Sequence, residues 1–163
     1  MNRGPDAAQQ NPGATSAVRL RRYEPRDEDA AIGLWLRTWQ AAYPQIDFAA
    51  RLEWWRQRWR SELVPTAEIV IAEADDEPVG FVTVDPSSGY LDQIVVAPQR
   101  WGCGIGAALM AEAKRLSPKG LTLDVNTDNA RAIGFYLQQG FLRSGAGVNP
   151  ASGKPVHRMS WEP

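Results

Sequence analysis

Three glycines at alternating positions, Gly102, Gly104 and Gly106, are the residues of this sequence with the clearest chemical meaning. The β-branched segment 91–96 precedes them, and an apolar segment with helical spacing, 105–116, follows. Glycines at the start of a helix let the backbone approach a ligand closely, and the first N–H groups of a helix have no acceptor within it. Together with the helix dipole, these donors favour anions. The pattern therefore predicts a loop that binds a phosphate-bearing molecule.

Two common phosphate-binding loops match this sequence less well. A nucleoside-triphosphate loop continues with Gly-Lys-Ser/Thr, whereas Gly106 is followed by two alanines. The dinucleotide-binding pattern G-x-G-x-x-G/A is satisfied by Gly102, Gly104 and Ala107, and Asp124 follows at about the right distance to bind a ribose. However, Asp124 lies inside a predicted strand instead of at its end, and the chain after it is too short for the rest of such a domain. An NAD-binding oxidoreductase is therefore the less favoured alternative.

A second segment, 121–141, narrows the choice, because it combines a short strand with a helix that carries polar residues at fixed spacing. Together the two segments resemble the GNAT superfamily of acetyl-CoA-dependent N-acetyltransferases. The first resembles the family's strand–loop–helix motif Q/R-x-x-G-x-G/A, with Trp101 where that motif usually has Arg or Gln. The resemblance is strong over 90–142 and extends in layout from 18 to 162. The second segment resembles the family's strand–helix motif through Asn129, Ala132, Tyr136, Gly140 and Phe141.

The resemblance implies a fold and a cofactor. The fold is α/β (α+β), GNAT-like, with a mixed, mostly antiparallel central sheet of six to seven strands flanked by about four helices. The cofactor is acetyl-CoA, the acyl donor: the glycine loop holds its diphosphate, and a backbone N–H of the strand at 94–96 polarises the thioester oxygen. The residues implied in cofactor binding are Ile94, Val95, Val96, Trp101, Gly102, Cys103, Gly104, Ile105, Gly106, Ala107, Asn129 and Tyr136.

Transfer of an acetyl group from a thioester to an amine needs a neutral amine and a proton for the departing thiolate. An alkylamine with a pKa of ~10.4 is protonated at pH 7, so a general base typically contributes about 10²- to 10⁴-fold. The match to the family's Asn and Tyr implies that Asn129 binds the cofactor arm and that Tyr136 protonates the thiolate. Helical spacing places both on one face. Tyr136 also fits a second role, in which its ring packs in the core and its hydroxyl lies at the rim.

Asp124 and Asp92 are the candidate general bases. Asp124 lies on the strand before Asn129, where some family members have a catalytic Glu, and Asp92 lies at the start of the cofactor strand, where others have an acidic residue. Because neighbouring side chains of a strand face opposite ways, we expect only one of Asp92 and Gln93 to line the cleft. Either carboxylate also fits a solvated or turn-capping role. We prefer Asp124 as the base.

The single cysteine and the single histidine fit structural roles better than chemical ones. Cys103 precedes a predicted helix, which would lower the pKa of its thiol, but His157 is far along the chain and forms no Cys-His motif with it. We interpret Cys103 as a small residue whose amide faces phosphate, and His157 as a strand residue. One His and one Cys are too few for a metal site, so we predict none.

The hydrophobic pattern predicts one domain at 17–163 after a disordered leader at 1–16 that is rich in Gly, Pro, Ala, Gln and Asn. Alternating apolar residues predict the strands, and tryptophan-rich apolar stripes predict the first two helices. We expect strands at 18–23, 68–74, 78–85, 90–96, 121–125, 141–147 and 156–161, and helices at 27–43, 47–63, 105–116 and from 129 onward.

By the resemblance, the first two helices border the acceptor site. Trp54 lies off the apolar stripe beside Arg51 and Arg58, so it is a candidate for lining a pocket or a dimer surface. Arg56, Arg58 and Arg60 would suit an anionic acceptor, but we favour a solvated basic face. The acceptor itself is not readable from the sequence.

Composition narrows the partners. A net charge of −1 gives no reason to expect nucleic acid or an anionic membrane, and no run of ~18 apolar residues is present. A single cysteine fits a reducing interior, so we expect a cytoplasmic protein, with a homodimer allowed. We predict an enzyme that transfers an acetyl group from acetyl-CoA to a primary amine of a small molecule or protein by direct nucleophilic attack. A non-catalytic acyl-CoA-binding regulatory module is the alternative.

Overall fold

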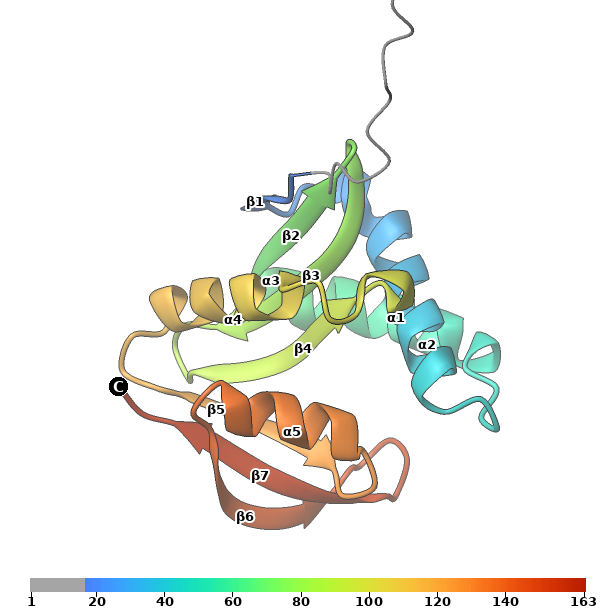
Figure 1. The fold of residues 1–163 in the computed structure, drawn as a ribbon. Helices are drawn as coiled ribbons and strands as arrows, with labels where there is room; N and C mark the ends of the chain where they lie inside the picture. The colour runs from blue at the N-terminus through green and yellow to red at the C-terminus, as the bar shows by residue number, and fades with distance from the viewer. Residues whose placement is uncertain (1–16) are drawn as a thin grey trace, which may run out of the picture.

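The computed structural model describes residues 17–163, so the leader that we predicted at 1–16 lies outside the described residues. Within residues 17–163, seven strands form one sheet in the order β1-β2-β3-β4-β5-β7-β6 (Figure 1). Neighbouring strands are antiparallel except β4 and β5, which are parallel. The predicted mixed, mostly antiparallel sheet is confirmed. The strands are β1 (Arg19–Arg22), β2 (Glu68–Ala74), β3 (Glu77–Asp85), β4 (Tyr90–Val96), β5 (Leu121–Asn126), β6 (Leu142–Val148) and β7 (Pro155–Trp161).

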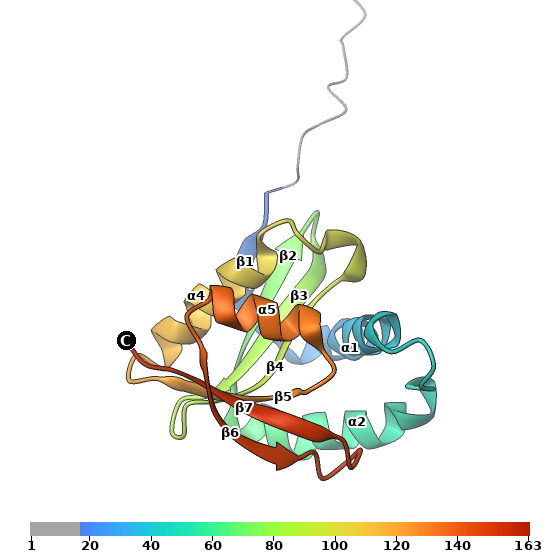
Figure 2. The same ribbon diagram turned by 60° about the horizontal axis from the view of Figure 1, so that its bottom comes forward.

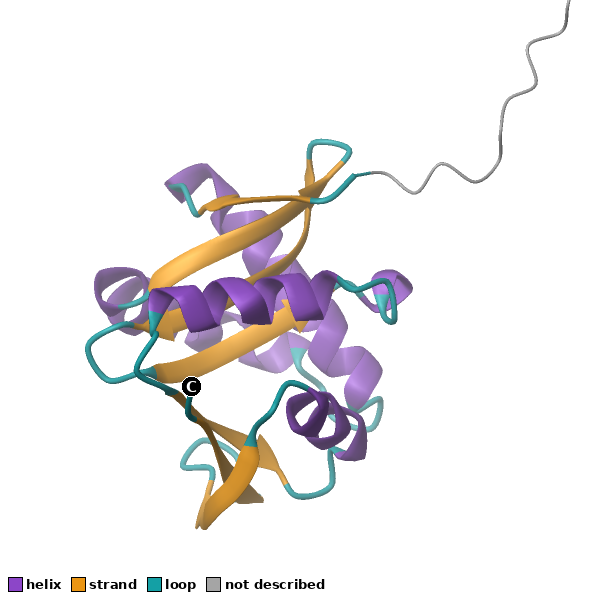
Figure 3. Cartoon of the chain, turned by 60° about the vertical axis from the view of Figure 1, so that its left-hand side comes forward, coloured by secondary structure: helices purple, strands orange, loops and turns teal. Residues whose placement is uncertain are grey.

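Helices cover both faces of the sheet. The helices α1 (Glu28–Ala42) and α2 (Leu52–Arg58) lie on one face, and α4 (Ile105–Leu116) and α5 (Ala130–Gln138) lie on the other (Figures 2 and 3). A π-helical turn and the short α3 (Val64–Thr66) continue α2 towards β2. In the described part of the chain, no helix is both long and apolar enough to cross a membrane.

Each face of the sheet has its own hydrophobic core. The core under α4 and α5 is largely aliphatic, whereas the core under α1 and α2 is aromatic. In the aromatic core, Trp35 stacks on Trp55 with ring centroids 4.8 Å apart, and Trp59 meets Phe81 edge-on at 5.3 Å. Such pairs stabilise the fold beyond the apolar area they bury. The tryptophan stripes that predict α1 and α2 are therefore core, and Trp54, outside the stripe, is 47% exposed.

The strands β4 and β5 meet at one end and separate towards the other. They pair only between Tyr90 and Thr122, and the Thr122 N–H donates to Gly89 O at 2.9 Å. Beyond this point the two strands diverge (Figure 1). The backbone groups of β4 that face β5 are therefore left without strand partners.

A β-bulge in β4 lies next to this divergence. Thr83 of β3 pairs with Gln93, but the following residue, Val84, pairs with Leu91, so Asp92 is an extra residue in β4. A bulge bends its strand and interrupts the alternation of side chains. Our expectation that only one of Asp92 and Gln93 faces the cleft is therefore wrong. Both side chains lie on the face covered by α1 and α2, where each meets a side chain of those helices.

Candidate active site

The loop between β4 and α4 presents free backbone donors. Gly102 and Gly104 have φ of +79° and +84°, left-handed values that residues with a Cβ rarely adopt. Gly104 caps α4, and Ala108 donates the first backbone bond of the helix to Gly104 O at 3.1 Å. Within residues 17–163, the N–H groups from Gly104 to Ala107 donate to no acceptor. The loop thus presents a run of free N–H donors at the start of α4, where the helix dipole favours an anion.

Gly106 is constrained by packing and not by its backbone conformation. A Cβ at this position would lie 3.2 Å from Cε2 and 3.3 Å from Cζ of Phe135, and the φ of Gly106 is not positive. Phe135 belongs to α5, so the first turn of α4 lies directly against α5. A glycine at 106 therefore sets how closely the phosphate-binding loop and the second motif approach each other.

Alternate N–H groups of β4 point into the opening between β4 and β5. The N–H groups of Gln93 and Ala97 both donate to β3, at 3.0 and 2.8 Å. Because backbone donors alternate in an antiparallel pair, the N–H groups of Ile94 and Val96 point the other way, towards the diverging β5. The side chain of Val95 is buried in the aromatic core. Ile94 and Val96 thus offer the free donors that could polarise a thioester oxygen.

Trp101 connects the loop to both neighbouring elements. Its indole N–H donates to Val96 O at 2.9 Å. The guanidinium carbon of Arg131, in the first turn of α5, lies 3.5 Å from the centroid of its ring. Trp101 stands where the family's motif usually has Arg or Gln. Its ring therefore stacks against a cation, Arg131, that comes from α5.

Asn129 and Tyr136 lie two turns apart on α5, as their spacing predicts. Asn129 caps the helix, and its Oδ1 accepts from the Ala132 N–H at 3.2 Å. The ring of Tyr136 packs against Phe135 and Phe141, with centroids 5.5 and 5.8 Å away. Its hydroxyl has no hydrogen-bond partner among the described residues, and burial raises the pKa of Tyr136 above its usual value. The ring of Tyr136 therefore packs in the core while its hydroxyl stays protonated, so the two roles considered for this residue are compatible.

Asp124 lies on β5 opposite Arg158 of β7. It accepts hydrogen bonds from Nε and Nη2 of Arg158 at 3.0 and 3.2 Å, and the Tyr90 hydroxyl lies 3.4 Å from its Oδ2. The ion pair is partly open to solvent, with the side chains of Arg158 and Asp124 54% and 26% exposed. Burial raises the pKa of Tyr90 to about 12. This carboxylate is therefore in reach of solvent and of a protonated phenol.

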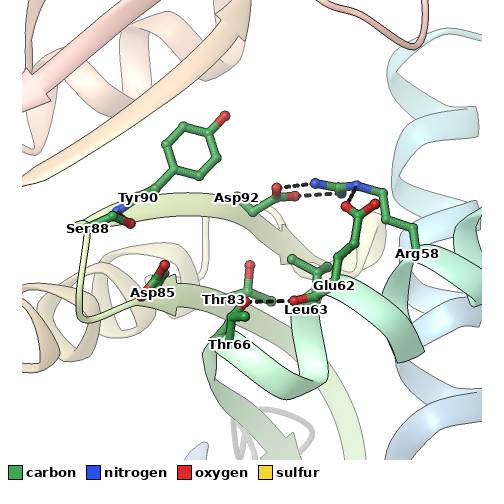
Figure 4. Close-up of a pocket in the computed structure, with 10 residues that line it drawn as sticks. Arg58, Glu62, Leu63, Thr66, Thr83, Asp85, Ser88, Tyr90 and Asp92 are labelled. Atoms are coloured by element: carbon green, nitrogen blue, oxygen red, sulfur yellow. Dashed lines mark hydrogen bonds and ion pairs between the residues drawn. The ribbon is translucent and has the colours of Figure 1, made fainter.

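Asp92 is held more tightly than Asp124. Arg58 of α2 binds both of its carboxylate oxygens, one of them at 2.9 Å (Figure 4). Gln93 Nε2 donates to Asp92 Oδ1 at 3.0 Å, and Trp39 Nε1 lies 3.4 Å from Gln93 Oε1. The side chains of Arg58 and Asp92 are only 24% and 14% exposed. Asp92 thus ties the bulge to α2.

A pocket opens beside the bulge, between α2, the chain that continues it and the β3–β4 turn (Figure 4). Its volume of about 220 Å³ is below the ~300–1,000 Å³ of typical small-molecule sites. Its carboxylates exceed its cations, since Arg58 is its single basic residue. The lining residues are Arg58, Glu62, Leu63, Thr66, Ala67, Thr83, Asp85, Ser88, Tyr90 and Asp92.

Sequence reasoning missed Arg58 and Tyr90 as site residues. Of the three arginines for which we expected a solvated basic face, only Arg60 is largely exposed, at 63%. Arg58 instead points inward to Asp92, and Arg56 binds Glu28 at 2.7 Å. A signal for Arg58 was present, since it lies three residues after the buried Trp55 and so shares its helix face. Tyr90 carried no comparable signal, because its place depends on the pairing of β4 with β5.

In the part of the chain that the structure describes, the side chains of the cysteine and the histidine form no hydrogen bond or ion pair with the candidate catalytic residues Asp92, Asp124 and Tyr136. Cys103 is exposed at the loop, but its N–H donates to Arg100 O at 3.3 Å, so our interpretation that its amide faces phosphate is corrected. His157 pairs with Val125 and Ala146 as a residue of β7, and its buried Nδ1 has no hydrogen-bond partner within residues 17–163. Among the described residues, no group of three or more His, Cys, Asp or Glu side chains is arranged to hold a metal ion.

The chain is similar to known acetyltransferases over most of its length. Residues 29–141 match the Acetyltransferase (GNAT) family. The peptidyl-lysine N-acetyltransferase YjaB of Salmonella typhimurium is 33% identical over 139 residues, which cover 85% of this chain and 92% of that protein. The mycothiol acetyltransferase of Kineococcus radiotolerans is 30% identical over 149 residues, 87% of this chain and 48% of that protein.

Solved structures agree with this assignment. The apo-form of YjaB from Escherichia coli superposes with a TM-score of 0.73 and 27% identity, over 89% of this chain and 97% of that one. The PaiA N-acetyltransferase of Thermoplasma acidophilum, solved in complex with coenzyme A, shares the fold with a TM-score of 0.72 and 19% identity, over 90% and 99% of the two chains. The chain belongs to the GNAT family of acetyltransferases, and it is an N-acetyltransferase that transfers an acetyl group from acetyl-CoA to an amine.

Proposed function

We propose that this enzyme acetylates lysine side chains of proteins. The observation that carries the proposal is the pocket beside the bulge, which is lined by three carboxylates and one cation, Arg58, with Leu63 as an apolar wall. The carboxylates are Glu62, Asp85 and Asp92. A lysine side chain is a cation on an apolar stem, so an acidic pocket with an apolar wall complements it. The YjaB proteins of S. typhimurium and E. coli, named peptidyl-lysine N-acetyltransferases, support the same acceptor.

We assign roles to the residues around the opening of the sheet. The neutral amine attacks the thioester carbonyl, a C–N bond forms, and the C–S bond breaks. Tyr136 gives its hydroxyl proton to the departing thiolate, and Asp124 takes the proton that the amine loses, directly or through a water molecule. A free N–H of Ile94 or Val96 polarises the carbonyl oxygen. Asp92 is the alternative base.

The test uses the purified full chain, acetyl-CoA and peptides that each contain one lysine and a blocked N-terminus. We expect thiol release together with the mass increase of one acetyl group, located on the lysine by fragmentation. The matched peptides carry norleucine in place of lysine and should not react. Acetylation of polyamines or of free peptide N-termini, without acetylation of any lysine peptide, would overturn the proposed acceptor. Acetyl-CoA binding without turnover on any amine would favour the regulatory module.

We also propose a cytoplasmic location and a homodimer. Two exposed apolar residues on the edge strand β6, Leu142 and Val148, support the dimer, since they are 71% and 65% exposed. Light scattering on the eluting peak of a size-exclusion column measures the mass directly. A monomer at micromolar concentration would remove the dimer from the proposal.

A further inference from the structure

Arg131 is a cation in an unfavourable place. It occupies the first turn of α5, two residues after the capping Asn129, where the positive end of the helix dipole repels a cation. No carboxylate in residues 17–163 forms an ion pair with it. The residue as a whole is exposed, and desolvation of its guanidinium by neighbouring atoms lowers the pKa of Arg131. An anion bound next to the guanidinium would offset the repulsion by the helix dipole, supply the missing charge partner and stabilise the desolvated charge.

Trp101 holds this guanidinium beside the phosphate-binding loop. The indole is fixed by its hydrogen bond to Val96 O at 2.9 Å, and Arg131 stacks on the ring face at 3.5 Å. Stacking uses only the face of a guanidinium, so the N–H donors in its plane remain available to an anion. The contact of Gly106 with Phe135 independently shows that the loop and α5 lie against each other.

The loop has no free cation of its own. Arg100 is the only charged residue between 97 and 107, and its Nη2 lies 3.9 Å from Asp75 Oδ2 in the β2–β3 turn. The loop therefore offers an anion the backbone N–H groups from Gly104 to Ala107 but no unpaired basic side chain. Arg131 is the unpaired basic side chain that the structure brings to this loop.

We propose that Arg131 binds the diphosphate of acetyl-CoA from the side of α5, opposite the backbone donors of the glycine loop. Arginine suits this role because its planar donors match two phosphate oxygens at once. The inference rests on the use of acetyl-CoA and not on lysine as the acceptor. It predicts that binding strength depends on the diphosphate and on the charge at position 131.

The test compares the wild-type full chain with Arg131→Ala by titration calorimetry. Acetyl-CoA and 3′-dephospho-CoA both keep the diphosphate, so we expect the Kd of each to rise by about ten- to a hundredfold. Binding of S-acetylpantetheine, which has no diphosphate, should change less than about twofold in an NMR titration. Arg131→Lys keeps the charge without the planar donors and should give an intermediate Kd. Arg143→Ala, an exposed arginine of β6, is the control and should leave all three ligands unaffected.

Each other outcome overturns the inference. An unchanged Kd for acetyl-CoA would show that Arg131 does not bind the cofactor. A loss for acetyl-CoA with no loss for dephospho-CoA would move the contact to the 3′-phosphate, and an equal loss for S-acetylpantetheine would show that Arg131 only shapes the cleft. Thermal melts of the variants show whether each is still folded at the titration temperature, which separates the loss of a contact to the cofactor from unfolding. These measurements need no acceptor, so a failed lysine assignment leaves them interpretable.

Discussion

A phenol that stays protonated at every working pH is a suitable proton donor, and burial gives Tyr136 this property by raising its pKa. We expect Tyr136→Phe, which removes only the hydroxyl, to lower kcat by roughly 10- to 10³-fold. The Kd of acetyl-CoA should stay within about twofold, because the ring still packs against Phe135 and Phe141. Steady-state rates and calorimetry on the same preparation check both. A variant with normal kcat would assign Tyr136 to the core alone.

Asp92 and Asp124 are each paired with an arginine, and a carboxylate can act as the base only if its ion pair opens. The choice between them therefore depends on which ion pair opens at the lower cost in free energy. The Arg58–Asp92 pair is the more buried, so freeing Asp92 for proton transfer exposes a poorly solvated guanidinium, whereas Arg158 is already half exposed. This difference favours Asp124 as the base. We expect Asp124→Asn to lower kcat/KM most near pH 7 and to recover towards pH 9–10, where more of an amine with pKa ~10.4 is already neutral.

The recovery of kcat/KM at high pH should not be hidden by deprotonation of the proton donor, Tyr136. Burial raises the pKa of Tyr136 and Tyr90 above the ordinary value of a phenol, to about 12 for Tyr90, so both stay protonated over the range in which the amine is deprotonated. The measurement is a pH–rate profile of Asp124→Asn beside the wild type and Asp92→Asn. A profile of Asp124→Asn that matches the wild type in shape and height would transfer the role to Asp92 or to no base.

At the scale of elements, the sequence predicted what depends on local pattern and missed what depends on partner strands. Hydrophobic periodicity placed every strand and the helices at 105–116 and 129 onward, since those signals lie within each segment. It could not predict the bulge at Asp92, because that register is set against β3, where Thr83 Oγ1 accepts the Gln93 N–H. The Arg131–Trp101 contact was equally hidden, since it joins elements through the packing of α4 on α5.

Two glycines in neighbouring elements should respond to alanine in opposite ways. Gly134 lies inside α5 with nothing within 4 Å of the position of a Cβ, so Gly134→Ala should stabilise the fold by about 0.5–1 kcal/mol through lower entropy of the unfolded chain. At Gly106 the Cβ would lie 3.2 Å from Phe135, so Gly106→Ala should destabilise it and weaken acetyl-CoA binding. Urea unfolding midpoints measure both. Equal stabilisation by the two changes would refute the packing role of Gly106.

At the scale of the molecule, the two faces of the sheet carry different tasks. The glycine loop and Tyr136 belong to the elements over the aliphatic core, whereas Asp92 and the acidic pocket face α2. Asp124 lies on the side of β5 opposite Leu123 and Val125 of the aliphatic core. The sheet is open between β4 and β5 beyond the pairing of Tyr90 with Thr122, so we expect a donor from the first face and an acceptor from the second to meet there. The bulge turns two successive polar side chains of β4 towards α1 and α2 next to that opening.

This arrangement depends on the first strand and helix being anchored to the sheet by a charge network. Asp27, 4% exposed, accepts two hydrogen bonds from Arg21 of β1 at 2.8 Å and one from the Glu24 N–H at 2.8 Å. Arg21 also binds Glu73 of β2 at 2.7 Å. The hydrogen bonds from Arg21, more than the opposing desolvation, hold the pKa of Asp27 below its usual value. The network therefore joins β1, the start of α1 and β2.

We expect Asp27→Asn to lower the free energy of unfolding by about 2 kcal/mol at pH 7, less than the 3–5 kcal/mol of a fully broken buried pair, because Glu73 still neutralises Arg21. Since the folded pKa of Asp27 lies below the unfolded one, this stabilisation is complete above the unfolded value near 4 and is lost as the pH falls through the folded value. The difference between wild type and variant in urea unfolding should thus be constant from pH ~5 to 8 and shrink below pH ~4. Arg115→Ala, which breaks only the exposed pair with Glu112, should leave stability unchanged. A difference that persisted undiminished at pH ~3 would mean that Asp27 contributes through packing and not through its charge.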